Sequence, residues 1–74
     1  MGTSNSYRYE PISVDVDEVK YVTDKALLVD IEGEEFWIPR SQIHEDSELY
    51  NSDHVGESGV LVIPRWLAEE KGLA

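Results

Sequence analysis

The feature that most limits how this chain can fold is an alternation of apolar residues that runs up to a glycine. Side chains of a strand point alternately to its two faces, and one face of residues 26–32 is apolar throughout: Leu27, Val29 and Ile31. Gly33 follows, and glycine reaches the positive φ that a tight hairpin turn requires. Residues 35–38 should therefore return antiparallel, which predicts a β-hairpin near the centre of the chain.

Further strands are predicted on both sides of this hairpin. In residues 12–17 the apolar side chains Ile12, Val14 and Val16 alternate with polar ones, as in a strand with one buried face. Residues 19–22 are rich in strand-forming types and either continue that strand past a bulge or begin a second one. Residues 60–63 form a continuous apolar run, which is typical of a strand covered on both faces.

Two proline-arginine pairs mark predicted corners. Pro39 ends the hairpin strand because it has no amide proton for the ladder, and residues 40–43 look like one helical turn that returns Ile43 to the core. Pro64 suits the first turn of a helix over residues 65–71, and Gly72 suits its left-handed stop. We expect the helix to pack through Trp66 and Leu67, because two turns of helix are marginal alone.

The length of 74 residues allows one hydrophobic core. We interpret residues 1–11 as a flexible arm and residues 12–74 as a single small β-rich domain. Residues 44–59 are polar and acidic and predict a long surface loop, with a short strand at residues 48–51. The predicted fold class is mainly β (α+β): a small SH3-like or OB-like barrel of four to five short strands with a short C-terminal helix, and an open α+β sheet as the second choice.

The formal net charge of −10 comes from 16 acidic and 6 basic residues. Such a surface repels nucleic-acid phosphates and favours basic protein partners, although the same charge can serve only to keep a small β-protein in solution. The sequence has no cysteine and no run of roughly 20 apolar residues that would suit a membrane helix. We therefore expect a cytoplasmic protein without membrane contact, and homodimerisation stays open.

Catalytic signatures are lacking, and no enzyme, metal or other cofactor is predicted. His44 and His54 lie in the acidic loop without the spacing of a metal site, and Gly56-Glu57-Ser58-Gly59 does not match a nucleophile elbow. The leading hypothesis is a noncatalytic accessory protein that binds a basic protein, as a nucleic-acid mimic or inhibitor. Its predicted acidic surface comprises Asp30, Glu32, Glu34, Glu35, Glu45, Asp46, Glu48 and Asp53, with hairpin and loop adjoining.

Two alternatives belong to other functional classes. A small barrel could bind single-stranded nucleic acid or a nucleoprotein by stacking bases on Tyr21 and Trp37 beside Arg40. In a related interpretation Arg40 and Arg65 lie on either side of a groove that binds a partner, and Trp37 is exposed beside it. A simpler interpretation is that both arginines belong to corners of the fold, where a strand ends and a helical turn begins. The second alternative is a self-associating structural component.

Residues 25–43 and 60–73, and above all the segment Trp-Ile-Pro-Arg-Ser-Gln-Ile, resemble short uncharacterised proteins encoded by bacteriophages and prophages. The resemblance implies a mobile genetic element in a bacterium as the setting, so that the expected accessory protein is of the phage type and its basic partner is a host or phage protein. It implies no catalytic or binding residue.

Overall fold

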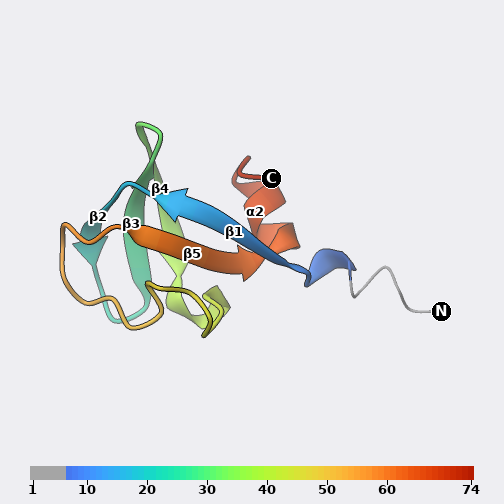
Figure 1. Cartoon of the computed structure of the whole chain (residues 1–74), viewed down its shortest axis with the longest axis horizontal. Coiled ribbons are helices and arrows are strands. Elements are labelled where there is room, and N and C mark those ends of the chain that lie inside the picture. Colours follow the sequence, from blue (N-terminus) through green and yellow to red (C-terminus); the bar gives the residue numbers. More distant parts are fainter. Residues whose placement is uncertain (1–6) are drawn as a thin grey trace.

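The structure is a computed structural model that describes residues 7–74 (Figure 1). Five strands, one 3-10 turn and one short helix follow in order: β1 (Pro11–Val16), β2 (Glu18–Val22), β3 (Ala26–Ile31), β4 (Glu34–Pro39), η1 (Arg40–Gln42), β5 (Gly59–Pro64) and α2 (Arg65–Glu70). Of the predicted arm, residues 1–6 lie outside the described residues. Pro11 already belongs to β1, and residue 10 is tied to α2 by a backbone bond from Arg65 N to Glu10 O of 2.8 Å.

β1 and β5 pair antiparallel from Pro11 opposite Pro64 to Val16 opposite Gly59. The predicted alternation of β1 is confirmed, because its apolar side chains are covered and its polar ones exposed. β5 is likewise covered on both faces at its centre, where Leu61, Val62 and Ile63 are all buried. Together these two strands form a two-stranded sheet.

β2 begins directly after Asp17 but pairs with β3 in the other sheet, so the chain changes sheets at that residue. The β2–β3 register shifts between Val19 and Tyr21, which leaves Lys20 as the extra residue of a bulge. An uninterrupted two-residue period would place Val19 and Tyr21 on one face. The bulge instead directs Val19 to the core and leaves Tyr21 exposed.

The predicted hairpin is confirmed. β3 and β4 pair from Ile31 opposite Glu34 to Ala26 opposite Pro39, which leaves a two-residue turn. Glu32 and Gly33 both have positive φ, 54° and 87°, as a type I′ turn requires. The chain then makes the expected turn at η1, and Ile43 is buried against the core.

Residues 44–58 connect η1 to β5 through turns, and the predicted short strand at residues 48–51 is wrong. The reason is local bonding: the backbone N–H groups of residues 47, 50 and 52 each reach a carbonyl three residues earlier. The loop is not only a surface feature, because Leu49 joins the core and Ser47 and Ser52 are buried. It also runs along β5, where His44 N donates to Val62 O at 2.8 Å and Glu48 N donates to Val60 O at 3.0 Å.

The helix α2 ends as its sequence predicts. Gly72 has φ of 76°, and its N–H donates to Glu69 O at 3.1 Å, while Leu73 N donates to Ala68 O at 2.7 Å. These two bonds are the Schellman motif, which satisfies the last carbonyls of a helix. Leu67 and Ala68 are buried, and Trp66 packs against the core.

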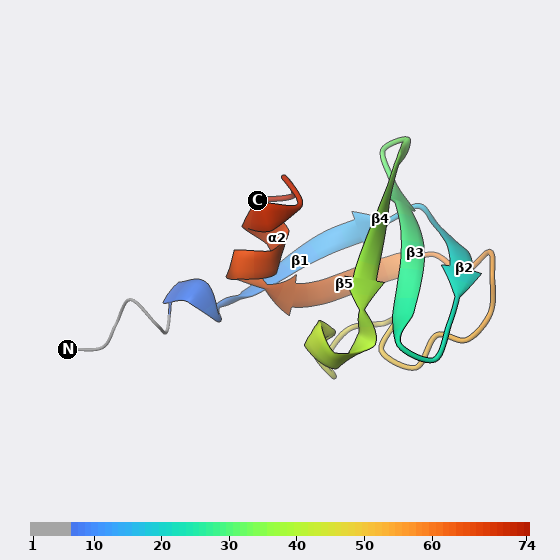
Figure 2. The ribbon, with the colours of Figure 1, turned by 180° about the vertical axis from the view of Figure 1, so that it is seen from behind.

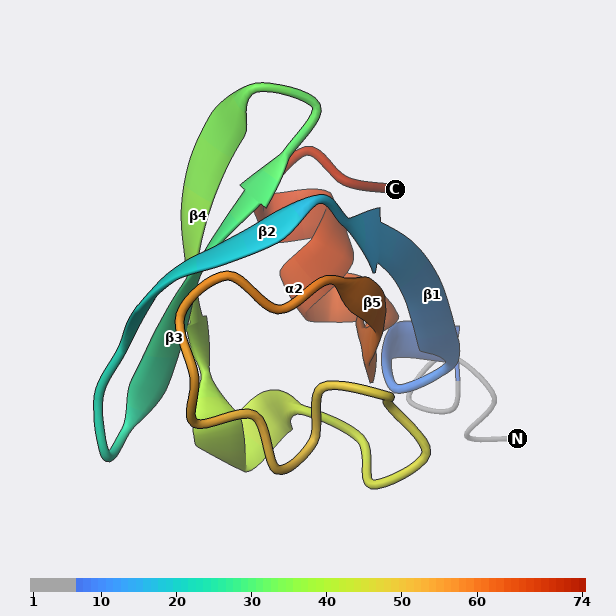
Figure 3. The ribbon, with the colours of Figure 1, turned by 60° about the vertical axis from the view of Figure 1, so that its left-hand side comes forward.

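The two sheets and α2 surround one hydrophobic core, with β1 and β5 on one side and β2, β3 and β4 on the other (Figure 3). Backbone pairing joins the described strands into a two-stranded sheet and a three-stranded sheet with the order β2-β3-β4 and does not close them into a barrel. The chain is therefore a mainly β protein with a short C-terminal helix. Within residues 7–74, no helix has the length and apolar character needed to cross a membrane.

Candidate protein-binding surface

An exposed aromatic pair lies on the outer face of the three-stranded sheet. The registers place Tyr21 opposite Leu28 and Leu28 opposite Trp37, so these three residues form a row across β2, β3 and β4. Tyr21 is 57% exposed and Trp37 46% exposed, whereas the next residues of β3 and β4, Val29 and Ile38, are fully buried. The two rings meet edge to face with their centroids 6.1 Å apart. The row is therefore apolar and open to solvent.

An acidic row runs beside the aromatic one. Glu18 lies opposite Asp30, and Asp30 lies opposite Glu35, again across all three strands. The two rows are separated along β3 and β4 by two residues, about 7 Å in an extended chain. We call the six residues of the two rows the outer sheet patch: Glu18, Tyr21, Leu28, Asp30, Glu35 and Trp37. Lys20 lies 3.7 Å from Glu18 and offsets one of the three carboxylates.

The predicted acidic residues fall into two groups. Asp30, Glu32, Glu34 and Glu35 belong to the β3–β4 hairpin. Glu45, Asp46 and Glu48 lie beyond η1, at the other end of β4, and Asp53 lies further along the same loop. Figures 1 and 3 show the hairpin tip and the segment 44–50 on opposite sides of the molecule. The expected adjoining arrangement of hairpin and loop is therefore not what the structure shows.

Several loop carboxylates are engaged within the chain itself. Glu48 Oε1 accepts a hydrogen bond from Val60 N at 2.8 Å, so this residue bonds to Val60 through both its backbone and its side chain. Asp46 lies 3.6 Å from His44, and Asp53 lies 2.6 Å from the neighbouring His54. Internal contacts do not separate the two groups, because Asp30 of the hairpin also accepts a hydrogen bond, from Gly33 N. The hairpin group is the stronger candidate for partner binding because Asp30 and Glu35 lie beside the exposed aromatic pair.

Both predicted arginines make architectural contacts. Arg40 Nε donates to Thr23 O at 2.8 Å, which ties η1 to the turn between β2 and β3. Arg65 binds Glu10 through Nε at 3.0 Å and Nη2 at 2.8 Å, and its guanidinium lies 4.6 Å from the centre of the Tyr7 ring. The hydrogen bonds that Arg65 donates to the Glu10 carboxylate raise the pKa of Arg65, so this side chain remains charged. These contacts within the chain fit the interpretation that Arg40 and Arg65 stabilise corners of the fold.

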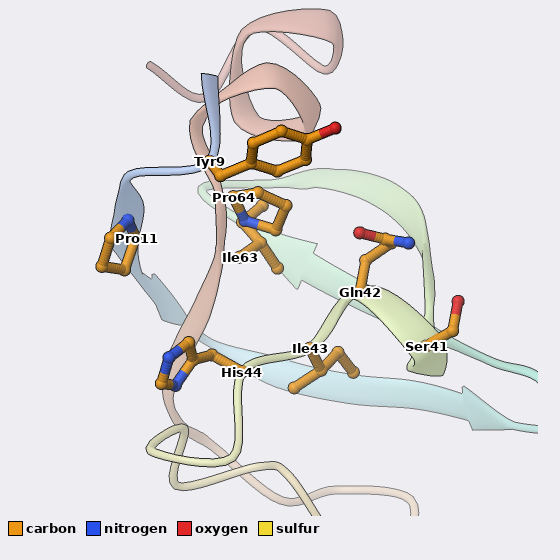
Figure 4. A pocket seen from close by; sticks show the side chains of 8 residues that line it. All are labelled: Tyr9, Pro11, Ser41, Gln42, Ile43, His44, Ile63 and Pro64. Atoms are coloured by element: carbon orange, nitrogen blue, oxygen red, sulfur yellow. The ribbon is translucent and has the colours of Figure 1, made fainter. Parts of the chain in front are cut away.

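A groove lies between the two proline-arginine corners (Figure 4). It has a volume of about 230 Å³, and Figure 4 shows Tyr9 and Pro64 on one side and Ser41 and Gln42 of η1 on the other. Its other lining residues are Pro11, Ile43, His44 and Ile63. Neither Arg40 nor Arg65 lines the groove. No carboxylate lines it either, so it offers no charge complementarity to a basic partner.

The outer sheet patch contains residues that sequence reasoning missed, chiefly Glu18 and Leu28. Leu28 could have been found, because the two-residue turn fixes its place opposite Trp37. Glu18 could not, because its position beside Asp30 depends on where β2 pairs. In the described part of the chain, no group of three or more His, Asp or Glu side chains is arranged to hold a metal ion.

No protein-family model, curated protein or solved structure matches the chain.

Proposed function

We propose that this protein is a noncatalytic accessory protein of the phage type that binds a basic host or phage protein through the outer sheet patch. The observation that supports it is the exposed aromatic pair beside a row of three carboxylates on a sheet face. Aromatic faces and carboxylates both attract guanidinium and ammonium groups. A lysine or arginine of the partner can therefore lie on Trp37 or Tyr21 and pair with Glu35 or Asp30.

The net charge extends this recognition beyond direct contact. A charge of −10 on 74 residues creates a negative potential that speeds the encounter with basic proteins and repels acidic ones. Basic proteins that bind nucleic acid present lysine and arginine to a phosphate backbone. We further propose that this protein occupies the nucleic-acid-binding site of its basic partner. It would then act as an inhibitor by imitating nucleic acid.

The test compares two variants with equal loss of charge. Asp30→Asn with Glu35→Gln removes two of the three negative charges of the outer sheet patch, and the Asn retains the Oδ1 atom that accepts from Gly33 N at 3.0 Å. Glu45→Gln with Asp46→Asn removes the same charge from the loop. We expect the wild-type protein and the loop variant to retain a basic protein from nuclease-treated bacterial lysate and to release it at high salt. We expect the patch variant not to retain it.

Equal retention by both variants, or retention that salt leaves unchanged, would refute the proposal. Equal retention would show that net charge or another surface recruits the protein, since the two variants differ only in where the charge is lost. Retention that salt leaves unchanged would show that charge does not hold the partner.

We also propose that the two sheets are halves of a small SH3-like or OB-like barrel. Support comes from the direct passage from β1 to β2 at Asp17, whose N–H donates to Asp30 O at 2.9 Å and so extends the β2–β3 ladder toward β1. Backbone nuclear Overhauser effects that join an edge strand of one sheet to an edge strand of the other would test it, and their absence would favour an open two-sheet arrangement.

A second candidate function is the binding of single-stranded nucleic acid on the same aromatic pair. The exposure of Tyr21 and Trp37 favours it, because stacked bases need open ring faces. The adjacent acidic row opposes it, since a phosphate backbone would be repelled there. Titration of a Trp66→Phe variant with oligonucleotides at low salt isolates the fluorescence of Trp37, and quenching would support this function over the first.

A further inference from the structure

The outer edge of β4 is open. β4 is the last strand in the order β2-β3-β4, and no backbone hydrogen bond within the described chain reaches its outer side between residues 34 and 38 (Figure 2). The edge of β5 and part of the edge of β2 are covered by the loop between η1 and β5. The loop residues 44–48 bond to β5, while Gly56 and Glu57 bond to Val19 of β2 at 2.7 Å each.

The hairpin determines which backbone groups of β4 are free. In a two-residue hairpin the flanking residues, here Ile31 and Glu34, exchange both ladder hydrogen bonds. Alternation along the ladder then turns the backbone of Phe36 and Ile38 toward β3 and that of Glu35 and Trp37 outward. Pro39 is consistent with this alternation. It lies two residues after Trp37, so its backbone nitrogen faces outward, where no N–H is needed for the β3–β4 ladder. Two N–H groups and two carbonyls of β4 are thus available to another strand.

The same two residues carry the side chains that define a partner. Glu35 and Trp37 both belong to the outer sheet patch and lie two residues apart, which is also the repeat of side chains on one face of an added strand. A strand paired with β4 therefore places one side chain beside Glu35 and the next of that face beside Trp37. The carboxylate selects a basic side chain, and the indole selects an arginine or an apolar group.

We propose that β4 receives an extended basic segment of the partner protein as an added antiparallel strand. The proposal rests on the proposed function and specifies how the basic partner is bound. Backbone hydrogen bonds would supply affinity and the alternating side chains specificity, as in other cases of strand addition. Charge complementarity argues for this occupant over a second copy of the chain, since each copy carries −10 and Glu34 and Glu35 lie on the edge itself.

The test uses three synthetic seven-residue peptides that alternate arginine and valine, one unmodified and two carrying backbone N-methyl groups. One is methylated on its arginine amides and the other on its valine amides, so that both have the same charge and the same number of methyl groups. Antiparallel pairing aims the arginine amides at β4 when the arginines lie over Glu35 and Trp37. We expect arginine methylation to weaken binding by about tenfold or more and valine methylation to leave it nearly unchanged.

A matched pair of protein variants tests the same edge. Glu35→Gln removes only the charge, whereas Glu35→Pro also removes the outward N–H at a position where proline leaves the β3 ladder intact. We expect Glu35→Pro to bind the unmodified peptide about fivefold more weakly than Glu35→Gln. Thermal melting of both variants confirms that each is folded before affinities are compared.

The outcomes separate this proposal from the proposed function. Equal binding of both methylated peptides would overturn strand addition while leaving an acidic binding face in place. Binding of the unmodified peptide that survives Asp30→Asn with Glu35→Gln, or no binding at low salt, would overturn both. Dimerisation of the free protein in sedimentation that Glu35→Pro abolishes would assign the edge to a second copy and overturn the proposal.

Discussion

Gly59→Ala should destabilise the fold through a contact between the loop and β5. Gly59 has φ of 150°, and an added Cβ would lie 2.7 Å from Glu48 Oε1. That oxygen is the atom that accepts from Val60 N at 2.8 Å. The carboxylate can swing away from the new methyl group only by giving up this hydrogen bond.

The magnitude follows from these two effects. A non-glycine residue in a sparsely populated backbone region costs about 1–3 kcal/mol, and the lost hydrogen bond costs about 1 kcal/mol more. We therefore expect the free energy of unfolding to fall by about 2–4 kcal/mol, a large share of the stability of a small domain. Urea unfolding followed by tryptophan fluorescence measures the change, and Ser58→Ala at the exposed neighbouring position serves as the control.

A double-mutant cycle with Glu48→Ala isolates the shared hydrogen bond. Gly59→Ala should cost less in the Glu48→Ala background, because the bond is already absent there. A loss below about 0.5 kcal/mol for Gly59→Ala alone would refute the reasoning, since it would mean that neither the backbone conformation nor the Glu48 contact is strained by a methyl group.

Other substitutions test the fold more broadly. Leu27→Ala at a fully buried position should cost about 2–5 kcal/mol in urea unfolding, and a cost below about 1 kcal/mol would place Leu27 outside the core. Gly33→Ala should lower stability by about 1–2 kcal/mol because of its φ of 87°, whereas an unchanged melting temperature would contradict the I′ turn. Ser47→Ala removes a buried hydroxyl that donates to Val60 O at 3.0 Å and should cost about 1–3 kcal/mol, with no cost if the loop does not pack on β5. Trp37→Ala, at an exposed site, should leave stability within about 1 kcal/mol while abolishing binding of the basic peptide.

Local signals in the sequence predict much of this fold. The hairpin follows from one glycine and the alternation before it, and the stop of α2 follows from Gly72 with Leu73 behind it. Each of these features depends on residues close together in the chain, so propensity and pattern suffice to predict it.

The features that the sequence did not predict depend on distant contacts. The bulge at Lys20 changes the face of Tyr21, and only pairing with β3 determines it. The burial of Leu49 and Ser47 requires β5 as a neighbour, although polar residues surround them in the sequence. The separation of the hairpin and loop carboxylates has the same origin, because it depends on where β4 directs the chain rather than on the spacing of acidic residues.

Amide hydrogen exchange of β4, read by NMR with and without the unmodified arginine-valine peptide, tests the central claim most directly. In the free protein Phe36 and Ile38 should exchange slowly and Glu35 and Trp37 quickly, and the peptide should slow the exchange of Glu35 and Trp37. Protection of all four amides in the free protein would show that the edge is already covered. Peptide-induced protection confined to other parts of the chain would contradict binding at the outer sheet patch.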